Sequence, residues 1–152
     1  MSTWRDSARW TRWLRGEDCP ICRAVREADA VAELEACRVM MPEDGPMRGY
    51  AWLAVRRHVI ELHELPADEG AALMRDLQRV SRAVATATNA VKLNWEIHGN
   101  TVPHLHVHLF PRYVGDPWEG RPIDPKSAKH PVYAPGECDA LRSRVAKELE
   151  AP

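Results

Sequence analysis

The sequence has no excess of charge of either sign and no long run of apolar residues. Its 21 lysines and arginines are balanced by 22 aspartates and glutamates, for a formal net charge of -1. Such a chain is not expected to bind bulk nucleic acid, and a local site must hold any anionic ligand. The longest apolar run, Tyr50 to Val55, is far too short to span a membrane, and the first residues lack a secretory signal. We therefore expect a soluble cytoplasmic protein with no membrane partner.

Cysteine is also scarce, with four residues in a chain of 152. A chain of this length can bury one sizeable core without disulfide bonds. In the cytoplasm, four cysteines are expected to be metal ligands or reactive thiols rather than a disulfide framework.

The apolar residues that are present predict helices and strands in a regular order. Helices are expected at 18–28, capped by Asp18, and from Leu65 onward, and strands at 33–41, 50–57, 92–98 and 103–111. The long helix places five apolar residues on one face: Leu73, Leu77, Val80, Val84 and Val91. This order predicts an α+β fold, with an antiparallel sheet of about five strands and helices packed mainly on one face.

Residues 17–152 are expected to form a single domain, and residues 1–16 an N-terminal extension rich in Trp and Arg. Three of the six tryptophans lie in this extension, where we expect a helix laid over the domain or a subunit contact. Within the domain, residues 112–135 form a proline-rich excursion and residues 136–150 a C-terminal helix.

Three histidines alternate with apolar residues in the segment 103–111, at positions 104, 106 and 108. Alternation indicates a half-buried strand, which would place His104, His106 and His108 in a row on one face, about 6.6 Å apart. An ordinary polar sheet surface does not need three imidazoles so close together. The row therefore favours a functional site.

The pair Cys19 and Cys22 has two interpretations. A Cys-x-x-Cys dithiol after a strand in a βαβ unit would indicate a redox site, but no strand is expected before it. The same spacing on a helical turn is half of a tetrahedral zinc site. His58 and one histidine of the row would complete it. Cys37 and Cys138 are expected to be structural thiols.

Histidine chemistry on phosphorus fits the remaining features, because a neutral imidazole is nucleophilic and its neighbours can donate protons. The run Gly99-Asn100-Thr101-Val102-Pro103 followed by residues 104–109 resembles the histidine triad (HIT) signature His-x-His-x-His-x-x. The Cys-x-x-Cys pair and a strand ending at His58 are similar to those of zinc-containing HIT hydrolases. The resemblance covers roughly residues 17–113.

The resemblance implies a role for each matching residue. His106 would be the nucleophile that attacks the α-phosphate of a nucleotide, and His108 would contact the phosphate and assist the leaving group. A structural zinc ion would be held by four ligands: Cys19, Cys22, His58 and His104. Substrate binding would fall to Asn94 and Thr101, and we add Asn100 and His98, which stand where this chain departs from the family pattern, as further candidates. The resemblance also implies a homodimer with sheets continued across the interface, and no organic cofactor.

Two departures from the family pattern bear on the substrate range. Many relatives begin the second strand with Gly-His, whereas this chain has Gly49-Tyr50, and His98 is a candidate to replace the missing imidazole. Many relatives have Gly-Gln ahead of the triad, whereas this chain has Gly99-Asn100.

The sequence therefore predicts a nucleotide hydrolase or nucleotidyl transferase that acts through a nucleotidyl-histidine intermediate. Its substrate would be a nucleoside phosphoramidate or a dinucleoside polyphosphate. One alternative is a metal-dependent hydrolase or cupin-like protein that uses the histidine row as ligands. A second is a non-enzymatic interaction module held together by zinc.

Overall fold

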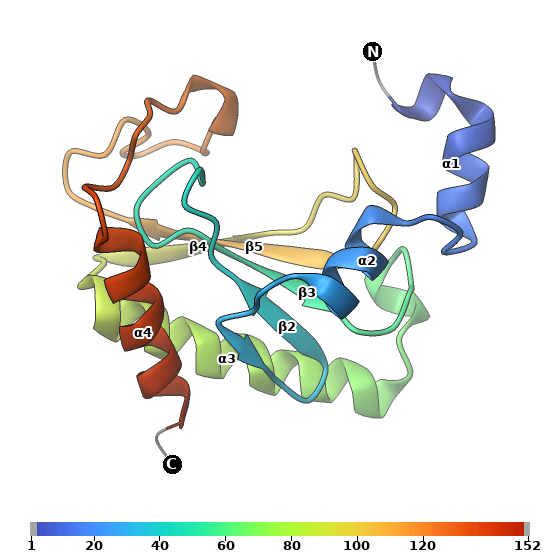
Figure 1. The fold of residues 1–152 in the computed structure, drawn as a ribbon, viewed down its shortest axis with the longest axis horizontal. Coiled ribbons are helices and arrows are strands. Elements are labelled where there is room, and N and C mark those ends of the chain that lie inside the picture. Colours follow the sequence, from blue (N-terminus) through green and yellow to red (C-terminus); the bar gives the residue numbers. More distant parts are fainter. Residues whose placement is uncertain (1–2, 151–152) are drawn as a thin grey trace.

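A five-stranded antiparallel sheet in the order β1-β2-β3-β5-β4 forms the centre of the fold (Figure 1). The computed structural model describes residues 3–150. Its strands are β1 (Ala32–Glu33), β2 (Cys37–Met40), β3 (Ala51–Val55), β4 (Lys92–Glu96) and β5 (His106–Arg112). Its α-helices are α1 (Ser7–Leu14), α2 (Pro20–Glu27), α3 (Ala67–Thr88) and α4 (Glu137–Glu150). Short 3-10 turns lie at Thr3–Arg5, Leu62–Glu64 and Pro125–Ser127. The predicted α+β architecture is confirmed.

Helices α3 and α4 pack against one face of the sheet and enclose the main core. Alternate side chains of β5, such as Val107 and Leu109, are fully buried on this face. They meet apolar residues of the two helices, among them Leu77, Val80 and Leu141. Helix α2 packs on the opposite face, where Ile21 joins a smaller cluster with Met40 and Ala54.

The register of β5 fixes which residues share a face with its histidines. His106 pairs with Ala54 of β3, and His108 pairs with Trp52 of β3 and Glu96 of β4. Directly opposite residues in an antiparallel pair point to the same face. His106 and His108 therefore lie on the face away from α3, beside the side chains of Trp52 and Glu96.

The sequence predicts one strand at 33–41, whereas the structure has two short strands there, β1 and β2, joined as a hairpin. The prediction of a single strand was therefore wrong. Strands β1 and β2 pair with each other, and residues 34–36 form the turn between them. A residue of α3 stabilises this turn: the Ala36 N–H donates to the buried carboxylate of Asp76 at 2.7 Å. This tertiary contact leaves no trace in the apolar periodicity.

Two helix ends also differ from expectation. Asp18 does not cap α2: its φ is 55°, in the left-handed region, and Cys19 is the N-cap residue. Helix α3 ends at Thr88, because Asn89 adopts a left-handed C-cap conformation. Val91 therefore lies beyond the helix, where it is 66% exposed, and does not belong to the buried face of α3.

The expected N-terminal helix is present as α1, which extends away from the sheet (Figure 1). None of its residues is buried. Hydrogen bonds connect this region to the rest of the chain, among them one from the Thr3 hydroxyl to the Thr101 carbonyl at 3.0 Å and one from His58 Nε2 to the Leu14 carbonyl at 3.3 Å. No helix within residues 3–150 is long and apolar enough to cross a membrane.

The proline-rich segment after β5 is tied back to the sheet by Arg112, the last residue of that strand. Its guanidinium donates to the Asp116 carboxylate at 2.8 and 2.9 Å and to Asn94 Oδ1 at 3.0 Å. It also donates to the carbonyls of Trp118 and Arg121. The buried Trp118 ring packs in a cluster with three residues of the histidine-bearing side: Met47, Tyr50 and Phe110.

Candidate active site and metal centre

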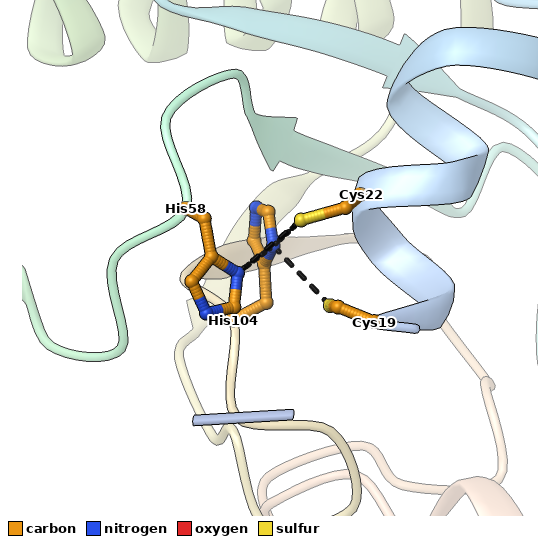
Figure 2. Close-up of side chains that lie close together, drawn as sticks. All are labelled: Cys19, Cys22, His58 and His104. Carbon is orange, nitrogen blue, oxygen red and sulfur yellow. Dashed lines mark hydrogen bonds between the residues drawn. The ribbon is translucent and has the colours of Figure 1, made fainter. Parts of the chain in front are cut away.

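Two cysteines and two histidines from three parts of the chain meet beside the sheet (Figure 2). Cys19 and Cys22 come from the start of α2, His58 follows β3, and His104 precedes β5. Cys22 Sγ lies 3.2 Å from His58 Nδ1 and 3.4 Å from His104 Nδ1, and Cys19 Sγ lies 3.6 Å from His104 Nδ1. All four potential ligand atoms lie within 4.8 Å of one another, and no other such group occurs within residues 3–150.

His104 does not stand in a row with the other two histidines, which corrects the expectation from alternation. Strand β5 begins only at His106, so strand geometry does not govern the side chain of His104. That side chain is fully buried and faces the two cysteines. The position matches the ligand role that the family resemblance implies.

Backbone carbonyls orient both imidazoles of the cluster. His104 Nε2 donates to the Val55 carbonyl at 2.8 Å, and His58 Nε2 donates to the Leu14 carbonyl. Each ring therefore presents the lone pair of Nδ1 to the cluster. Metal-binding histidines typically donate their other ring N–H in this way.

The spacing of the four atoms fits a tetrahedral zinc ion. Bonds of about 2.3 Å to sulfur and 2.0–2.1 Å to nitrogen correspond to ligand separations of about 3.4–3.8 Å. Four of the contacts, at 3.2–3.6 Å, agree with these separations, and the remaining pairs of atoms lie within 4.8 Å. The Cys2His2 donor set is also one that structural zinc sites use.

The protonation states of the cluster depend on a cation. Burial and the neighbouring Cys19 raise the pKa of the Cys22 thiol to about 11, which keeps it protonated when no cation is bound. A bound metal ion reverses this preference and deprotonates a coordinating thiol. Burial lowers the pKa of His104 to about 4, so this imidazole is neutral, as a ligand must be.

The other two cysteines lie in the main core, away from this cluster. Cys37 and Cys138 are 0% and 2% exposed. Burial, together with Asp76, raises the pKa of Cys37, and burial also raises that of Cys138. Both are therefore protonated, unreactive thiols.

His106 lies at the centre of the face opposite α3, and the backbone fixes its ring. Its Nδ1–H donates to the His104 carbonyl at 2.6 Å, because a carbonyl oxygen can only accept. Nε2 is left with a lone pair. Burial lowers the pKa of His106, which favours this neutral, nucleophilic form.

His108 lies next to His106, with ring centroids 4.8 Å apart. The Tyr50 hydroxyl is 2.7 Å from His108 Nδ1, and the His98 ring centroid is 5.7 Å from that of His108. Burial, together with His106 and His98, lowers the pKa of His108 to about 4. His98 itself donates from Nε2 to Glu96 at 2.8 Å. The centre of this face is therefore a set of adjacent imidazoles bordered by a phenol and a carboxylate.

The four residues expected to bind substrate lie in different settings. His98 is next to His108 at the edge of the site. Asn94 shares the same sheet face, but its amide oxygen accepts from Arg112. Asn100 and Thr101 are exposed in the loop before the triad, where the Thr101 carbonyl accepts from Thr3.

The sequence did not predict three residues that contact the site residues: Tyr50, Glu96 and Asp116. Glu96 could have been found, because it is two residues from His98 on an expected strand and so shares its face. The contacts of Tyr50 with His108 and of Asp116 with Arg112 depend on tertiary packing.

A hollow of about 570 Å³ opens on this face beside β4. Its walls include Asn94 and Glu96 of the strand and Arg121 of the proline-rich segment. Because Glu96 pairs with His108, the hollow begins one side chain away from the imidazoles.

Comparison with known proteins identifies relatives of this architecture. The HIT domain family matches residues 23–115. A bifunctional bis(5'-adenosyl)-triphosphatase/adenylylsulfatase from Arabidopsis thaliana is 39% identical over 66 residues, which cover 40% of this chain and only 37% of that protein. An adenosine 5'-monophosphoramidase from Schizosaccharomyces pombe is 26% identical over 88 residues, which cover 54% of this chain and 66% of the relative.

Solved structures show the same fold. A histidine triad protein from Bradyrhizobium japonicum superposes with a TM-score of 0.70 at 29% identity, covering 80% of this chain and 90% of that one. A zinc-bound histidine triad family protein from Mycobacterium smegmatis superposes with a TM-score of 0.63 at 24% identity, covering 86% of this chain and 94% of that one.

Proposed function

The chain belongs to the HIT domain family, and on this basis we propose that it is a nucleotide hydrolase or nucleotidyl transferase. The substrate would be a nucleoside phosphoramidate or a dinucleoside polyphosphate, attacked at the α-phosphate. One observation carries this proposal: His106 donates from Nδ1 to the His104 carbonyl and so presents a nucleophilic Nε2 beside the second imidazole of His108. Related proteins named as an adenosine 5'-monophosphoramidase and a bis(5'-adenosyl)-triphosphatase support this substrate class.

The reaction would proceed in two displacements at phosphorus. His106 Nε2 attacks the α-phosphorus, a P–N bond forms, and the bond to the leaving group breaks. His108 donates a hydrogen bond from its Nε2–H to the phosphate and assists the leaving group, which takes its proton from water. Water, or another acceptor in a transfer reaction, then attacks the same phosphorus and releases His106.

The His104 carbonyl has a direct role in the first displacement. As His106 Nε2 forms its bond to phosphorus, the ring becomes positively charged. The carbonyl oxygen, 2.6 Å from Nδ1, stabilises this charge without having to move. His104 thus contributes its backbone to the nucleophile and its side chain to the Cys/His cluster.

We assign a structural zinc ion to Cys19, Cys22, His58 and His104. When bound, it would supply folding free energy by joining the start of α2 to the segments before and after the central strands. The proposed displacements at His106 use side chains and backbone groups of the protein. Among the remaining polar residues, we assign His98, Asn100, Thr101 and Asn94 to substrate binding.

We also propose that two copies associate through β4, which is an edge strand of the sheet. Trp95 and Ile97, at the end of this edge, are 40% and 48% exposed, which supports an apolar contact there. Light scattering coupled to gel filtration should give the mass of a dimer.

The alternatives fit the geometry less well. A catalytic metal held by His106 and His108 would need further ligands, and the Cys/His cluster is the only compact group of three or more ligands within residues 3–150. A non-enzymatic module would leave the oriented imidazoles of His106 and His108 without a role.

Trapping the covalent intermediate tests the proposed function. The enzyme is quenched during turnover of adenosine 5'-phosphoramidate or a diadenosine polyphosphate, and its peptides are analysed under non-acidic conditions because the P–N bond is acid-labile. We expect the mass of a nucleotidyl group on the peptide that contains His106. Turnover without an adduct, combined with full activity of His106→Ala, would refute the proposal.

A further inference from the structure

The hydroxyl of Tyr50 contacts Nδ1 of His108, and Nε2 of that ring has no hydrogen-bond partner within residues 3–150. Tyr50 precedes β3, and its Oη lies 2.7 Å from His108 Nδ1 with the two rings stacked at an interplanar angle of 20°. Tyr50 is only 8% exposed and packs against Phe110 with ring centroids 5.0 Å apart. The phenol is therefore a fixed part of the site.

The direction of this hydrogen bond follows from the other groups available. Within residues 3–150 the Tyr50 hydroxyl has no second hydrogen-bond partner. If His108 Nδ1–H donated to the phenol oxygen, the phenol proton would be left buried without an acceptor, which is costly. If Tyr50 donates, its proton and the His108 Nδ1 lone pair are both satisfied. Burial also raises the pKa of Tyr50, so the phenol keeps the proton it donates.

We propose that Tyr50 is a positioning residue that holds His108 in the tautomer with its proton on Nε2. His108 then presents an N–H donor to the substrate. This inference rests on the proposed function for its catalytic meaning, but the tautomer itself is a property of the resting protein.

The consequence is that two adjacent histidines hold opposite tautomers. His106 carries its proton on Nδ1, fixed by the His104 carbonyl, and offers a lone pair at Nε2. His108 carries its proton on Nε2, fixed by Tyr50. A nucleophile and a donor thus lie side by side, as attack on an anionic phosphate requires, because a second lone pair facing the phosphate oxygens would repel them.

The other neighbours of His108 do not replace this contact. His98 and His106 approach the ring at centroid distances of 5.7 and 4.8 Å, without a hydrogen bond to it. Glu96 lies opposite on β4 and accepts from His98. Loss of the phenol hydroxyl would therefore leave Nδ1 of His108 without a donor and the tautomer unspecified.

Nuclear magnetic resonance tests the tautomer without any substrate. In protein labelled with nitrogen-15 in histidine, two-bond proton–nitrogen correlations distinguish a protonated ring nitrogen from a bare one. We expect His108 in the wild type to show a bare Nδ1 and a protonated Nε2. Tyr50→Phe, which keeps the aromatic ring, should move both signals toward those of a tautomer mixture. A protonated Nδ1 in the wild type would overturn the proposal, as would unchanged His108 signals in Tyr50→Phe.

Tyr113→Phe is the matched control. Its hydroxyl donates to the Arg48 carbonyl at 2.9 Å, so the variant also loses one phenol hydrogen bond on this side of the molecule but no contact with His108. We expect the His108 signals of this variant to match those of the wild type. The same shift in both variants would mean that general loosening, and not Tyr50, sets the tautomer.

Kinetics then links the tautomer to catalysis. With adenosine 5'-phosphoramidate, Tyr50→Phe should lower kcat about tenfold to a hundredfold, as expected for the loss of one hydrogen bond to a charged group, with KM nearly unchanged. Tyr113→Phe should retain wild-type kcat. An unchanged kcat in Tyr50→Phe would overturn the catalytic part of the proposal. If wild-type protein hydrolyses no nucleotide yet shows the expected tautomer, the proposed function fails and the positioning by Tyr50 stands.

Discussion

His104 supports His106 through its backbone while its side chain faces the two cysteines: its carbonyl accepts from His106 Nδ1 at 2.6 Å, and its own Nδ1 lies 3.4 Å from Cys22 Sγ. One residue therefore belongs to both the Cys/His cluster and the histidine site. The contact between the two sites is a hydrogen bond to the backbone. We therefore expect loss of the metal ion to lower the reaction rate by moving the His106 ring, and not by changing the charge of that ring.

The first prediction concerns zinc. Purified protein should contain about one zinc ion per chain, and a Cys19→Ser/Cys22→Ser double variant should contain almost none. The variant should also unfold at a temperature lower by at least roughly 10 °C, because structural zinc contributes directly to folding free energy. Elemental analysis and calorimetry measure the two effects. Cys138→Ala removes a buried thiol outside the cluster and should keep its zinc; retention of zinc by the double variant would contradict the assignment.

The second prediction concerns the nucleophile. His106→Ala should lower nucleotide turnover by several orders of magnitude, because removal of the nucleophile eliminates the two-step route. Zinc content and the unfolding temperature should stay close to those of the wild type. Steady-state kinetics with adenosine 5'-phosphoramidate measures the loss. His63→Ala, which changes an exposed histidine of the Leu62–Glu64 turn, is the control and should be fully active.

The Cys/His cluster could be predicted from the sequence because cysteine spacing and family resemblance both carry information about its four residues. The row of three histidines could be predicted only in part. Alternation holds for His106 and His108, which lie in β5, but it fails for His104, which lies before the strand. Periodicity cannot show where pairing with a neighbouring strand begins.

Long-range contacts could not be predicted for a related reason. The hairpin at residues 32–40 depends on Asp76, 40 residues away from Ala36, and the tautomer proposed for His108 depends on Tyr50, 58 residues away. Such pairs share no local pattern. From the sequence, Tyr50 was only a departure from the family pattern. Its contact with His108 is seen only in the folded structure.

The third prediction concerns acid stability. The hydrogen bonds from Arg112 lower the pKa of Asp116 from 3.8 to about 2. Because the folded-state pKa is lower than the unfolded one, the pair stabilises the fold above pH about 4, and this contribution is lost as the pH falls toward about 2. Asp116→Asn should therefore lower the free energy of unfolding by about 2 kcal/mol at pH 7. Its deficit should shrink between about pH 4 and 2.

Urea unfolding over this pH range measures the effect. Asp139→Asn is the control, because Asp139 forms an ion pair with Arg142 while its side chain is 79% exposed, and such pairs contribute little. A constant difference between wild type and Asp116→Asn at all pH values would contradict the prediction.

The fourth prediction concerns the hairpin at residues 32–40. Asp76 is 1% exposed and accepts from the Ala36 N–H at 2.7 Å. Asp76→Ala should lower the free energy of unfolding by about 1–3 kcal/mol, because the partly buried Ala36 N–H loses its acceptor. Asp76→Asn keeps an acceptor oxygen and should lose less. Equal stability of Asp76→Ala and wild type in urea unfolding would show that the contact is unimportant.

The position of β5 in the sheet has a consequence for how the protein is made. It is the last strand to leave the ribosome, yet it lies between β3 and β4. Until residues 106–112 are synthesised, both of those strands expose unpaired edges, which makes the nascent chain vulnerable to aggregation. The strand that closes the sheet is also the one that carries His106 and His108. A chain that stops before residue 106 therefore lacks both the central pairing of the sheet and the proposed nucleophile.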